Sequence, residues 1–400
     1  MEPRTLPDVP WRHRAGLETL IRALGEARFV GGAVRDTLLG KDVQDVDIAT
    51  PLPPQEVIER LGAAGIKTVP TGIAHGTITA VLPDGPVEVT TLRRDVTTDG
   101  RRATVAFSDD WREDAARRDF TVNALYADPA SGAIFDYFGG RQDLADRRVR
   151  FIGDPAQRIA EDHLRILRFF RFHARFGAGA PDAAGLAACE ARAKDLMALS
   201  RERIADELGK LLGLPDPAPT VREMQQRGIF LAMLPEVDAD AVARLEALVA
   251  RESAAGIAPD AVRRLIAILP TEPRAADGVA TRLRASKALR KRLATARTGD
   301  ASAAEMLYRW GITEALDRLL LSAQPTETIV PQVRAVEAME RPMLPIGGGA
   351  LVSRGLQAGP SVARALHAVE RRWIDEGFPD AARVQAIADE EVAQALRDTI

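Results

Sequence analysis

Residues 29–40 read FVGGAVRDTLLG and are followed at 43–49 by VQDVDIA. The first run predicts a short strand that ends in two glycines, then a helix that stops at the last glycine of the run. Gly31 and Gly32 have no Cβ, so a triphosphate can come close to the backbone amides. Arg35, one turn into the helix, can add a charge-assisted contact to phosphate oxygens.

The second run predicts a pair of carboxylates on one face of a strand. Its polar and apolar residues alternate, so Asp45 and Asp47 are expected to point the same way. Two such carboxylates repel each other unless a cation lies between them, and Mg²⁺ prefers hard oxygen ligands of this kind. Glu88, on an expected neighbouring strand, is the candidate third carboxylate. The combination favours metal-dependent nucleotidyl transfer, in which two Mg²⁺ ions activate a hydroxyl and stabilise the leaving pyrophosphate.

Each piece alone has an ordinary explanation, a tight turn for the glycine pair and a solvated strand edge for the acids. In this order and spacing they resemble the first motif of the class II CCA-adding tRNA nucleotidyltransferase and poly(A) polymerase family, Gly-Gly-x-Val-Arg-Asp, Leu-Leu-Gly and Asp-x-Asp. The resemblance covers roughly residues 25–230 and is thinner beyond. It implies CTP and ATP as substrates, the 3′ end of tRNA as partner and Mg²⁺ as cofactor.

A second motif, AARRDFTVNAL, occupies residues 115–125, where a helix is expected to run into a strand. Its polar residues would then converge at the edge of that strand, although Asp119 could also simply cap a helix. The family resemblance implies that this segment reads the ribose of the nucleotide. Arg117 or Arg118 would contact phosphate or sugar, Asp119 would accept a hydrogen bond from the 2′-hydroxyl, and Asn123 would complete the set.

A third motif lies in residues 154–171. On one continuous helix, Asp162 and Arg165 would share a face and offer an acceptor beside a donor. That pair suits the amine and ring nitrogen common to cytosine and adenine, and it opposes uracil and guanine. The alternative is an ordinary surface ion pair. Arg168 and Arg171 follow Arg165 on the same side of the expected helix and form a stripe of arginines with it. Such a stripe indicates an anionic partner such as triphosphate or tRNA backbone.

Two further segments are informative because of the resemblance. Residues 91–105 are polar and lack a regular period, which indicates a loop, either mobile or simply a connection. Family members that add the terminal adenosine carry a flexible element here with the signature matched by Asp99, Gly100 and Arg101. Residues 136–144 resemble the family's Gly-Gly-x-x-Asp-Leu turn and are interpreted as a hinge.

Bulk properties predict a cytoplasmic α+β enzyme of several modules. The chain has 400 residues, a net charge of −3, one cysteine (Cys189, expected in a buried helix) and five histidines, which disfavours a disulfide framework or a zinc site. No apolar run is long enough to span a membrane, and no secretory signal is recognisable. Ser200 is expected to cap a helix over 201–212.

The expected order is a nucleotidyltransferase head with a small mixed sheet and flanking helices (1–150), a helical neck with the base-reading helix (151–230), and a helical, tRNA-binding body and tail (231–400). Residues 342–359 should be a connection before the last helices. The strands of the head are expected at 66–69, 76–82, 87–92, 122–127 and 133–135.

The sequence therefore predicts template-independent addition of CMP and AMP to the 3′ end of tRNA. Alternatives with the same chemistry are a poly(A) polymerase and a specialist that adds only A or only CC. A nucleotide- or RNA-binding module without turnover is a different class, and a pure binder has no need for repelling acids on one strand. The tail also departs from the family, because the Gly-x-Asp-Leu pattern has no acid at residues 345–351.

Overall fold

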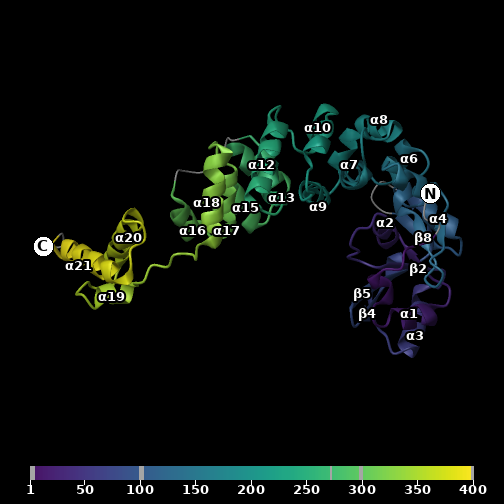
Figure 1. Cartoon of the computed structure of the whole chain (residues 1–400), viewed down its shortest axis with the longest axis horizontal. Coiled ribbons are helices and arrows are strands. Elements are labelled where there is room, and N and C mark those ends of the chain that lie inside the picture. Colours follow the sequence, from purple (N-terminus) through teal and green to yellow (C-terminus); the bar gives the residue numbers. More distant parts are fainter. Residues whose placement is uncertain (1–4, 99–102, 271–272, 297–300, 398–400) are drawn as a thin grey trace. The chain divides into compact units, whose positions relative to one another are not determined.

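The computed structural model of the chain describes residues 5–98, 103–270, 273–296 and 301–397. It divides into two compact units, Met1–Val242 and Ala243–Ile400. The mixed sheet and the helices that follow it as far as Val242 belong to the first unit (Figure 1). The predicted α+β class is confirmed, whereas the three-part division into head, neck and body stays a prediction.

The first unit contains a seven-stranded sheet in the order β3-β4-β5-β2-β1-β8-β9. β2 pairs in parallel with β5, and the other neighbouring pairs are antiparallel. A separate antiparallel ribbon is made by β6 and β7. The strands are β1 (Arg28–Val30), β2 (Asp47–Thr50), β3 (Lys67–Gly72), β4 (Thr77–Leu82), β5 (Gly85–Thr91), β6 (Arg93–Thr98), β7 (Ala103–Phe107), β8 (Leu125–Ala127) and β9 (Ile134–Asp136).

Helices lie between the strands in the sequence and follow the last strand. In the first unit they are η1 (Pro10–His13), α1 (Leu17–Leu24), α2 (Gly32–Leu38), α3 (Pro54–Ala63), η2 (Ile73–His75), α4 (Trp111–Ala116), η3 (Thr121–Asn123), α5 (Gly140–Ala145), α6 (Pro155–Glu161), α7 (Arg165–Phe176), α8 (Ala183–Ala191), η4 (Ala193–Ala198), α9 (Arg201–Leu212), α10 (Ala218–Gln226) and α11 (Ile229–Met233). α12 (Ala241–Ala255) begins at the end of this unit.

The second unit is helical throughout its described residues. After α12 it contains α13 (Ala261–Ile268), α14 (Pro273–Arg282), α15 (Lys287–Thr295), α16 (Ala303–Trp310), α17 (Ile312–Leu320), α18 (Thr326–Ala338), α19 (Gly348–Val352), α20 (Pro360–Asp375) and α21 (Ala381–Arg397). One apolar core involves α12, α13 and α16–α18, and another involves α19–α21. The expected connection at 342–359 thus contains the short helix α19. Of the helices that the structure describes, none is long and apolar enough to cross a membrane.

The two faces of the sheet have different roles. Val46, Ile48, Val87 and Val89 are buried on one face, and α3 packs against β3, β4 and β5. Because side chains alternate along a strand, the residues between them point to the opposite face. Asp47 is in register with Glu88, and Glu88 with Thr79, so a polar row crosses that face. The alternating pattern therefore places the acids on the face that the core leaves open.

Several local predictions are confirmed. The helix after the glycine pair is α2, which ends at Leu38. Ser200 caps α9, accepting a hydrogen bond from the backbone amide of Arg203. Cys189 is fully buried in α8, and burial raises the pKa of its thiol.

Other local predictions are wrong. The strand expected over 43–49 begins only at Asp47, so Asp45 precedes it. β1 is three residues long and pairs with β2 only at Ile48 and Ala49. The residues before Asp47 therefore have no β1 partner for strand hydrogen bonds. Within residues 91–105, Arg93–Thr98 form β6 and Ala103 begins β7, so these described residues belong to a β ribbon rather than to an irregular loop. The signature residues Asp99, Gly100 and Arg101 lie outside the described residues.

Two further elements differ in kind. The strand expected over 122–127 is the 3₁₀ helix η3 followed by a shorter strand, β8. The continuous helix expected through the third motif is broken between α6 and α7. Asp162 has extended backbone angles, and its side chain accepts a hydrogen bond from the amide of Leu164. An aspartate that binds a nearby amide in this way competes with helix propagation.

Candidate functional site

A cavity of about 490 Å³ in the first unit gathers residues from all three sequence motifs. The start of α2, the start of β2, the segment after α4, the helix η3 and the start of α7 each contribute to its wall. Eleven of the fourteen predicted site residues line it: Gly31, Gly32, Arg35, Asp47, Arg117, Arg118, Asp119, Asn123, Asp162, Arg165 and Arg168. Asp45, Glu88 and Arg171 are not part of the lining.

The lining carries a surplus of positive charge. It holds six arginines and three aspartates, which leaves three formal positive charges in a chain whose net charge is −3. Several of the guanidinium groups are fixed by protein partners rather than extended into solvent, so their positions are set before any ligand arrives. A cavity of this size and charge suits a compact polyanion.

The glycine turn at the entrance to α2 has a backbone that other residues cannot adopt easily. Gly31 has φ 66° and ψ −119°, and a Cβ there would lie 3.3 Å from Nη1 of Arg118. Its amide donates to the carbonyl oxygen of Leu125, at 3.1 Å. The amide of Gly31, expected to be free for phosphate, is therefore engaged, and the first turn of α2 from Gly32 onward is left for that role.

Arg35 lies directly beneath this turn. Its Nε donates to Asp36 at 2.7 Å, and its Nη1 donates to the side-chain oxygen of Asn123 at 2.5 Å. Its Nη2 would be 3.7 Å from a Cβ on Gly32, so the third nitrogen faces the glycine turn. Burial lowers the pKa of Arg35, while Asp36 opposes the shift.

We expect Gly31→Ala to weaken nucleotide binding strongly while the protein still folds. The alanine has to adopt a positive φ and bring its Cβ against Arg118, at a cost of about 1 to 3 kcal/mol. The loss should appear as a rise of roughly 5- to 100-fold in the KM for nucleotide. Gly40→Ala is the matched control, since Gly40 also has a positive φ but a Cβ there meets nothing within 4 Å. Equal KM values for the two variants would contradict a close approach at Gly31.

The acidic part of the site combines Asp47 with Glu88. The two residues are paired in register on β2 and β5, with Asp47 half-buried and Glu88 exposed. Burial, followed by the charges of Glu88 and Asp45, raises the pKa of Asp47 to about 6. Within the described ranges, no group of three or more potential ligands is arranged to hold a metal ion. Mg²⁺ is commonly held by one or two carboxylates together with substrate phosphates, so this pair fits such an ion.

Asp114 organises the basic pair, and the sequence analysis did not single it out. It is buried and accepts hydrogen bonds from Arg117 at 2.8 Å, from Arg118 at 3.2 Å and from the hydroxyl of Tyr126 at 2.6 Å. Although burial raises its pKa, the two arginines lower it to a net value of about 2. The i, i+3 and i, i+4 spacing from Asp114 to the arginines is the signal that could have indicated this cluster.

Asp119 accepts four hydrogen bonds. One oxygen accepts from the amide of Phe120 and from Asn123, both at 2.9 Å, and the other accepts from Nε and Nη2 of Arg168 at 2.7 and 2.6 Å. A carboxylate offers about four acceptor positions. The ribose contact implied by the family resemblance therefore requires one of these bonds to be exchanged.

Asp162 and Arg165 do not form the ordinary ion pair with each other that was the alternative to base reading, because each pairs with another residue. Asp162 forms an ion pair with Arg203 at 2.7 Å. Arg165 pairs with Glu161 at 2.6 Å. The break between α6 and α7 lies at Asp162, and both side chains line the cavity.

The arginine stripe of α7 is satisfied mostly by the protein itself. Arg171 is buried against Glu207, with an Nε–Oε2 distance of 2.5 Å, and Arg175 pairs with Asp36. The sequence analysis expected triphosphate or tRNA backbone to bind these arginines. At Arg171 and Arg175 the negative charge is instead supplied by carboxylates of the protein. The cavity instead includes Arg93 and Phe172, which the sequence analysis did not select. Arg93 begins β6, and Phe172 is a buried residue of α7.

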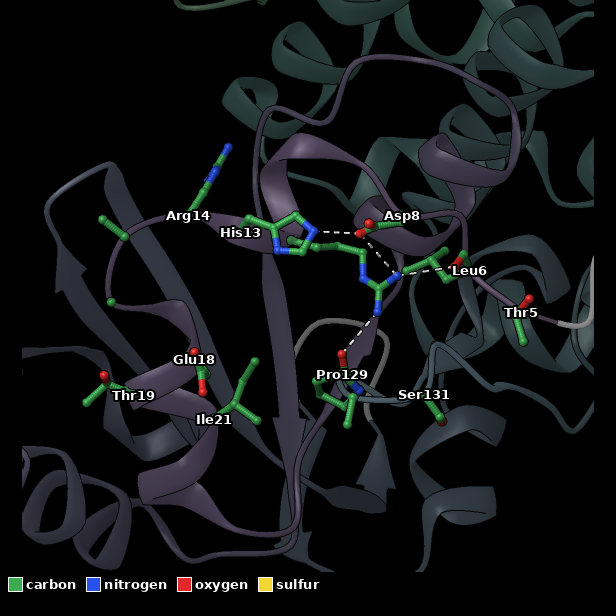
Figure 2. Close-up of a pocket in the computed structure, with 14 residues that line it drawn as sticks. Thr5, Leu6, Asp8, His13, Arg14, Glu18, Thr19, Ile21, Pro129 and Ser131 are labelled. Carbon is green, nitrogen blue, oxygen red and sulfur yellow. Dashed lines mark hydrogen bonds and ion pairs between the residues drawn. The ribbon is translucent and has the colours of Figure 1, made fainter.

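A larger cavity of about 870 Å³ lies near the N-terminal end of the described chain and contains none of the predicted site residues. Figure 2 shows His13 and Asp8 facing each other there, at 2.6 Å. Arg12 is tied to the backbone carbonyls of Leu6, Pro7 and Pro129. The larger cavity thus contains residues of none of the three sequence motifs, all of which meet in the smaller one, and the smaller one is the candidate active site.

Comparisons with known proteins are consistent with this geometry. A family model described as "Poly A polymerase head domain" matches residues 27–150, and one described as "Probable RNA and SrmB-binding site of polymerase A" matches residues 182–240. The human "CCA tRNA nucleotidyltransferase 1, mitochondrial" is 48% identical over 198 residues, which are 49% of this chain and 45% of the human protein. The chain thus matches about half the length of the human relative.

Two further proteins match over nearly their whole length. The "CCA-adding enzyme" of Latilactobacillus sakei is 32% identical over 386 residues, which cover 91% of this chain and 94% of that protein. The crystal structure of the Bacillus stearothermophilus CCA-adding enzyme in complex with CTP is similar with a TM-score of 0.69 and 26% identity. That match covers 94% of this chain and 97% of the other.

Proposed function

Since the chain belongs to the family of CCA-adding enzymes, we propose that it adds CMP and AMP, from CTP and ATP, to the 3′ end of tRNA without a nucleic acid template. The observation that carries this proposal is that one arginine-rich cavity combines the glycine turn, the basic pair and the Asp162–Arg165 segment, with Asp47 at its wall. The names of the relatives, which specify CCA addition and tRNA, add support.

In this proposal the triphosphate lies against the glycine turn. Arg35 faces Gly32 with its Nη2 group and is held in place by Asp36 and Asn123. Arg117 and Arg118 are held by Asp114, so they can donate to phosphate or sugar oxygens without being ordered first. Guanidinium groups that are already oriented lose less entropy when they bind a phosphate.

Asp47, together with Glu88 and Asp45, would hold divalent cations, and we propose Mg²⁺. When bound there, Mg²⁺ lowers the pKa of the attacking 3′-hydroxyl and neutralises charge on the triphosphate. The charges of Glu88 and Asp45 raise the pKa of Asp47, and a cation bound between the carboxylates would oppose this effect. The catalytic contribution of the chain is then to hold acids and nucleotide in a fixed relation.

Base selection is assigned to Asp162 and Arg165. Cytosine and adenine each present an amine beside an acceptor nitrogen, so a carboxylate and a guanidinium held side by side serve both. Asp162 accepts from Arg203 and from the amide of Leu164, and a carboxylate still has acceptor positions left for an amine. Arg168, which also lines the cavity, would face the nucleotide beside Asp119.

Transcripts of tRNA that end at the discriminator base, at C and at CC test this proposal when each is incubated with Mg²⁺ and one labelled nucleotide. We expect C on the first two and A on the third, with little U or G. Addition of A to the CC transcript alone would mean an A-adding specialist, and addition that stops at CC would mean a CC-adding specialist. Long A ladders on any RNA would mean a poly(A) polymerase. Binding without incorporation would leave only a binding module.

The cytoplasm is the compartment we propose. This compartment was predicted from the sequence and stays a proposal, and the human relative is a mitochondrial protein by name.

A further inference from the structure

Arg158, which the sequence analysis did not select, lies between two parts of the candidate site. It belongs to α6, is 7% exposed and does not line the cavity. Its Nη2 donates to the backbone carbonyl oxygens of Arg117 and Arg118, at 2.5 and 2.7 Å. Its Nη1 donates to Oε2 of Glu161, at 2.5 Å. One side chain thus ties the basic pair to the end of α6.

The same contacts close into a ring that includes Arg165. Oε2 of Glu161 also accepts from Nη1 of Arg165 at 2.6 Å, and the carbonyl oxygen of Arg117 also accepts from Nη2 of Arg165 at 3.2 Å. The carbonyl of Arg158 accepts a further bond from Nη1 of Arg165, at 2.8 Å. We call these three side chains, with the carbonyl of Arg117, the Arg158 ring.

The Arg158 ring fixes the direction of the Arg165 guanidinium. The Arg165 guanidinium donates to three acceptors, which are the carbonyls of Arg117 and Arg158 and the half-buried carboxylate of Glu161. The ring spans the break between α6 and α7. A planar guanidinium held by several acceptors at once has little freedom to rotate. Base selection depends on such fixed direction, because a misplaced donor no longer distinguishes an acceptor ring nitrogen from an N–H.

We infer that Arg158 is a positioning residue for nucleotide selection, which holds Arg165 in the orientation that reads the base. This inference depends on the proposed function of the cavity. Arg158 contacts neither nucleotide nor metal in this assignment. It acts through the Arg117 carbonyl and Glu161.

The test compares Arg158→Lys and Arg158→Met with the wild-type enzyme on tRNA that ends at the discriminator base. Lysine keeps a cation next to Glu161 but cannot donate to both carbonyls in a fixed plane, and methionine keeps only the volume. We expect the ratio of kcat/KM for CTP to that for UTP to fall roughly 10- to 100-fold in the lysine variant and further in the methionine variant. The KM for CTP should change more than kcat.

Arg60→Lys is the matched control. Arg60 likewise donates to a backbone carbonyl, that of Leu24 at 3.1 Å, and to a glutamate one turn earlier, Glu56 at 2.6 Å, but it lies outside the cavity. Its substitution should leave the CTP to UTP ratio unchanged. Thermal unfolding of all variants separates loss of selection from loss of fold.

A folded Arg158→Lys variant that loses activity equally with CTP and UTP would overturn the inference, since a purely structural role lowers both. If that variant does not fold, Glu161→Gln is the variant that tests the inference. It weakens the Arg158 ring at the carboxylate that accepts from Arg158 and Arg165, so it should lower the same ratio of kcat/KM for CTP to that for UTP. An unchanged ratio in Glu161→Gln would also overturn the inference. Failure of the wild-type enzyme to incorporate C would instead refute the proposed function itself.

Discussion

Asp47→Asn should abolish nucleotidyl transfer and at the same time make the protein more stable. The substitution removes a carboxylate at the wall of the cavity, in register with Glu88, without changing the size of the side chain. Loss of a ligand for a catalytic cation removes several kcal/mol of transition-state stabilisation, so we expect kcat to fall about a thousandfold or more. Single-turnover incorporation of labelled CMP measures this loss.

The gain in stability follows from the pKa of Asp47. Burial, with Glu88 as the second cause, raises it from 3.8 to about 6. A carboxyl whose pKa is higher in the folded state destabilises that state when it ionises, so the cost is full above pH 6 and disappears as the pH falls from 6 to 4. Without divalent cations at pH 8, Asp47→Asn should therefore have the higher unfolding midpoint, and the difference should vanish near pH 4.

Asp128→Asn is the matched control for this prediction. Burial raises the pKa of Asp128, but hydrogen bonds from Ser131 and Ala130 outweigh it, and the net shift is downward. Asp128 does not line the cavity. This variant should keep its activity and become less stable, the reverse of Asp47→Asn. An Asp47→Asn enzyme that incorporates CMP at the normal rate would show that the metal-binding assignment is wrong.

Asp119→Asn should cause the second large effect, a loss of both stability and sugar selection. The substitution removes the charge that Arg168 contacts at 2.6 and 2.7 Å, and Asp119 is only 8% exposed. Removing one partner of a buried pair is strongly destabilising, but the Arg168 side chain is 31% exposed. We therefore expect the free energy of unfolding at pH 7 to fall by roughly 2 to 4 kcal/mol, less than for a fully buried pair.

The pH dependence of this loss has a defined sign. Burial raises the pKa of Asp119, but Arg168 and Asn123 outweigh it and lower the pKa from 3.8 to about 2. A carboxyl with a lowered pKa stabilises the folded state fully above its unfolded pKa, and this contribution is lost as the pH falls through the folded value. The difference between wild type and Asp119→Asn should thus be constant above pH 4 and shrink between pH 4 and 2, as measured by denaturant unfolding.

The same variant tests the role of Asp119 toward the ribose. We expect the ratio of kcat/KM for CTP to that for dCTP to fall, because the network of Asp119, Asn123 and Arg168, which we propose contacts the sugar, loses its central acceptor. Asp206→Asn, which removes an exposed ion pair with Lys210 on α9, is the control and should change neither quantity. A variant with wild-type sugar selection would remove Asp119 from the ribose site.

Short-range features of the site were predictable because they depend on local chemistry. Gly31 has the positive φ that a residue without a Cβ allows, and Ser200 caps α9 because its hydroxyl reaches an amide three residues on. Asp47 and Glu88 share a face because side chains alternate along strands. The resemblance to the family then supplied the expectation that three separate motifs meet in one site.

The sequence by itself determined which residue types could do the chemistry and, for most of them, on which kind of element they lie. Only the tertiary structure decided their partners: Asp162 pairs with Arg203, Arg171 with Glu207, and Arg158 with carbonyls forty residues away. The reason is that a charged side chain withdrawn from water binds whichever opposite group the packing of distant segments brings near, and spacing along the chain does not specify that group.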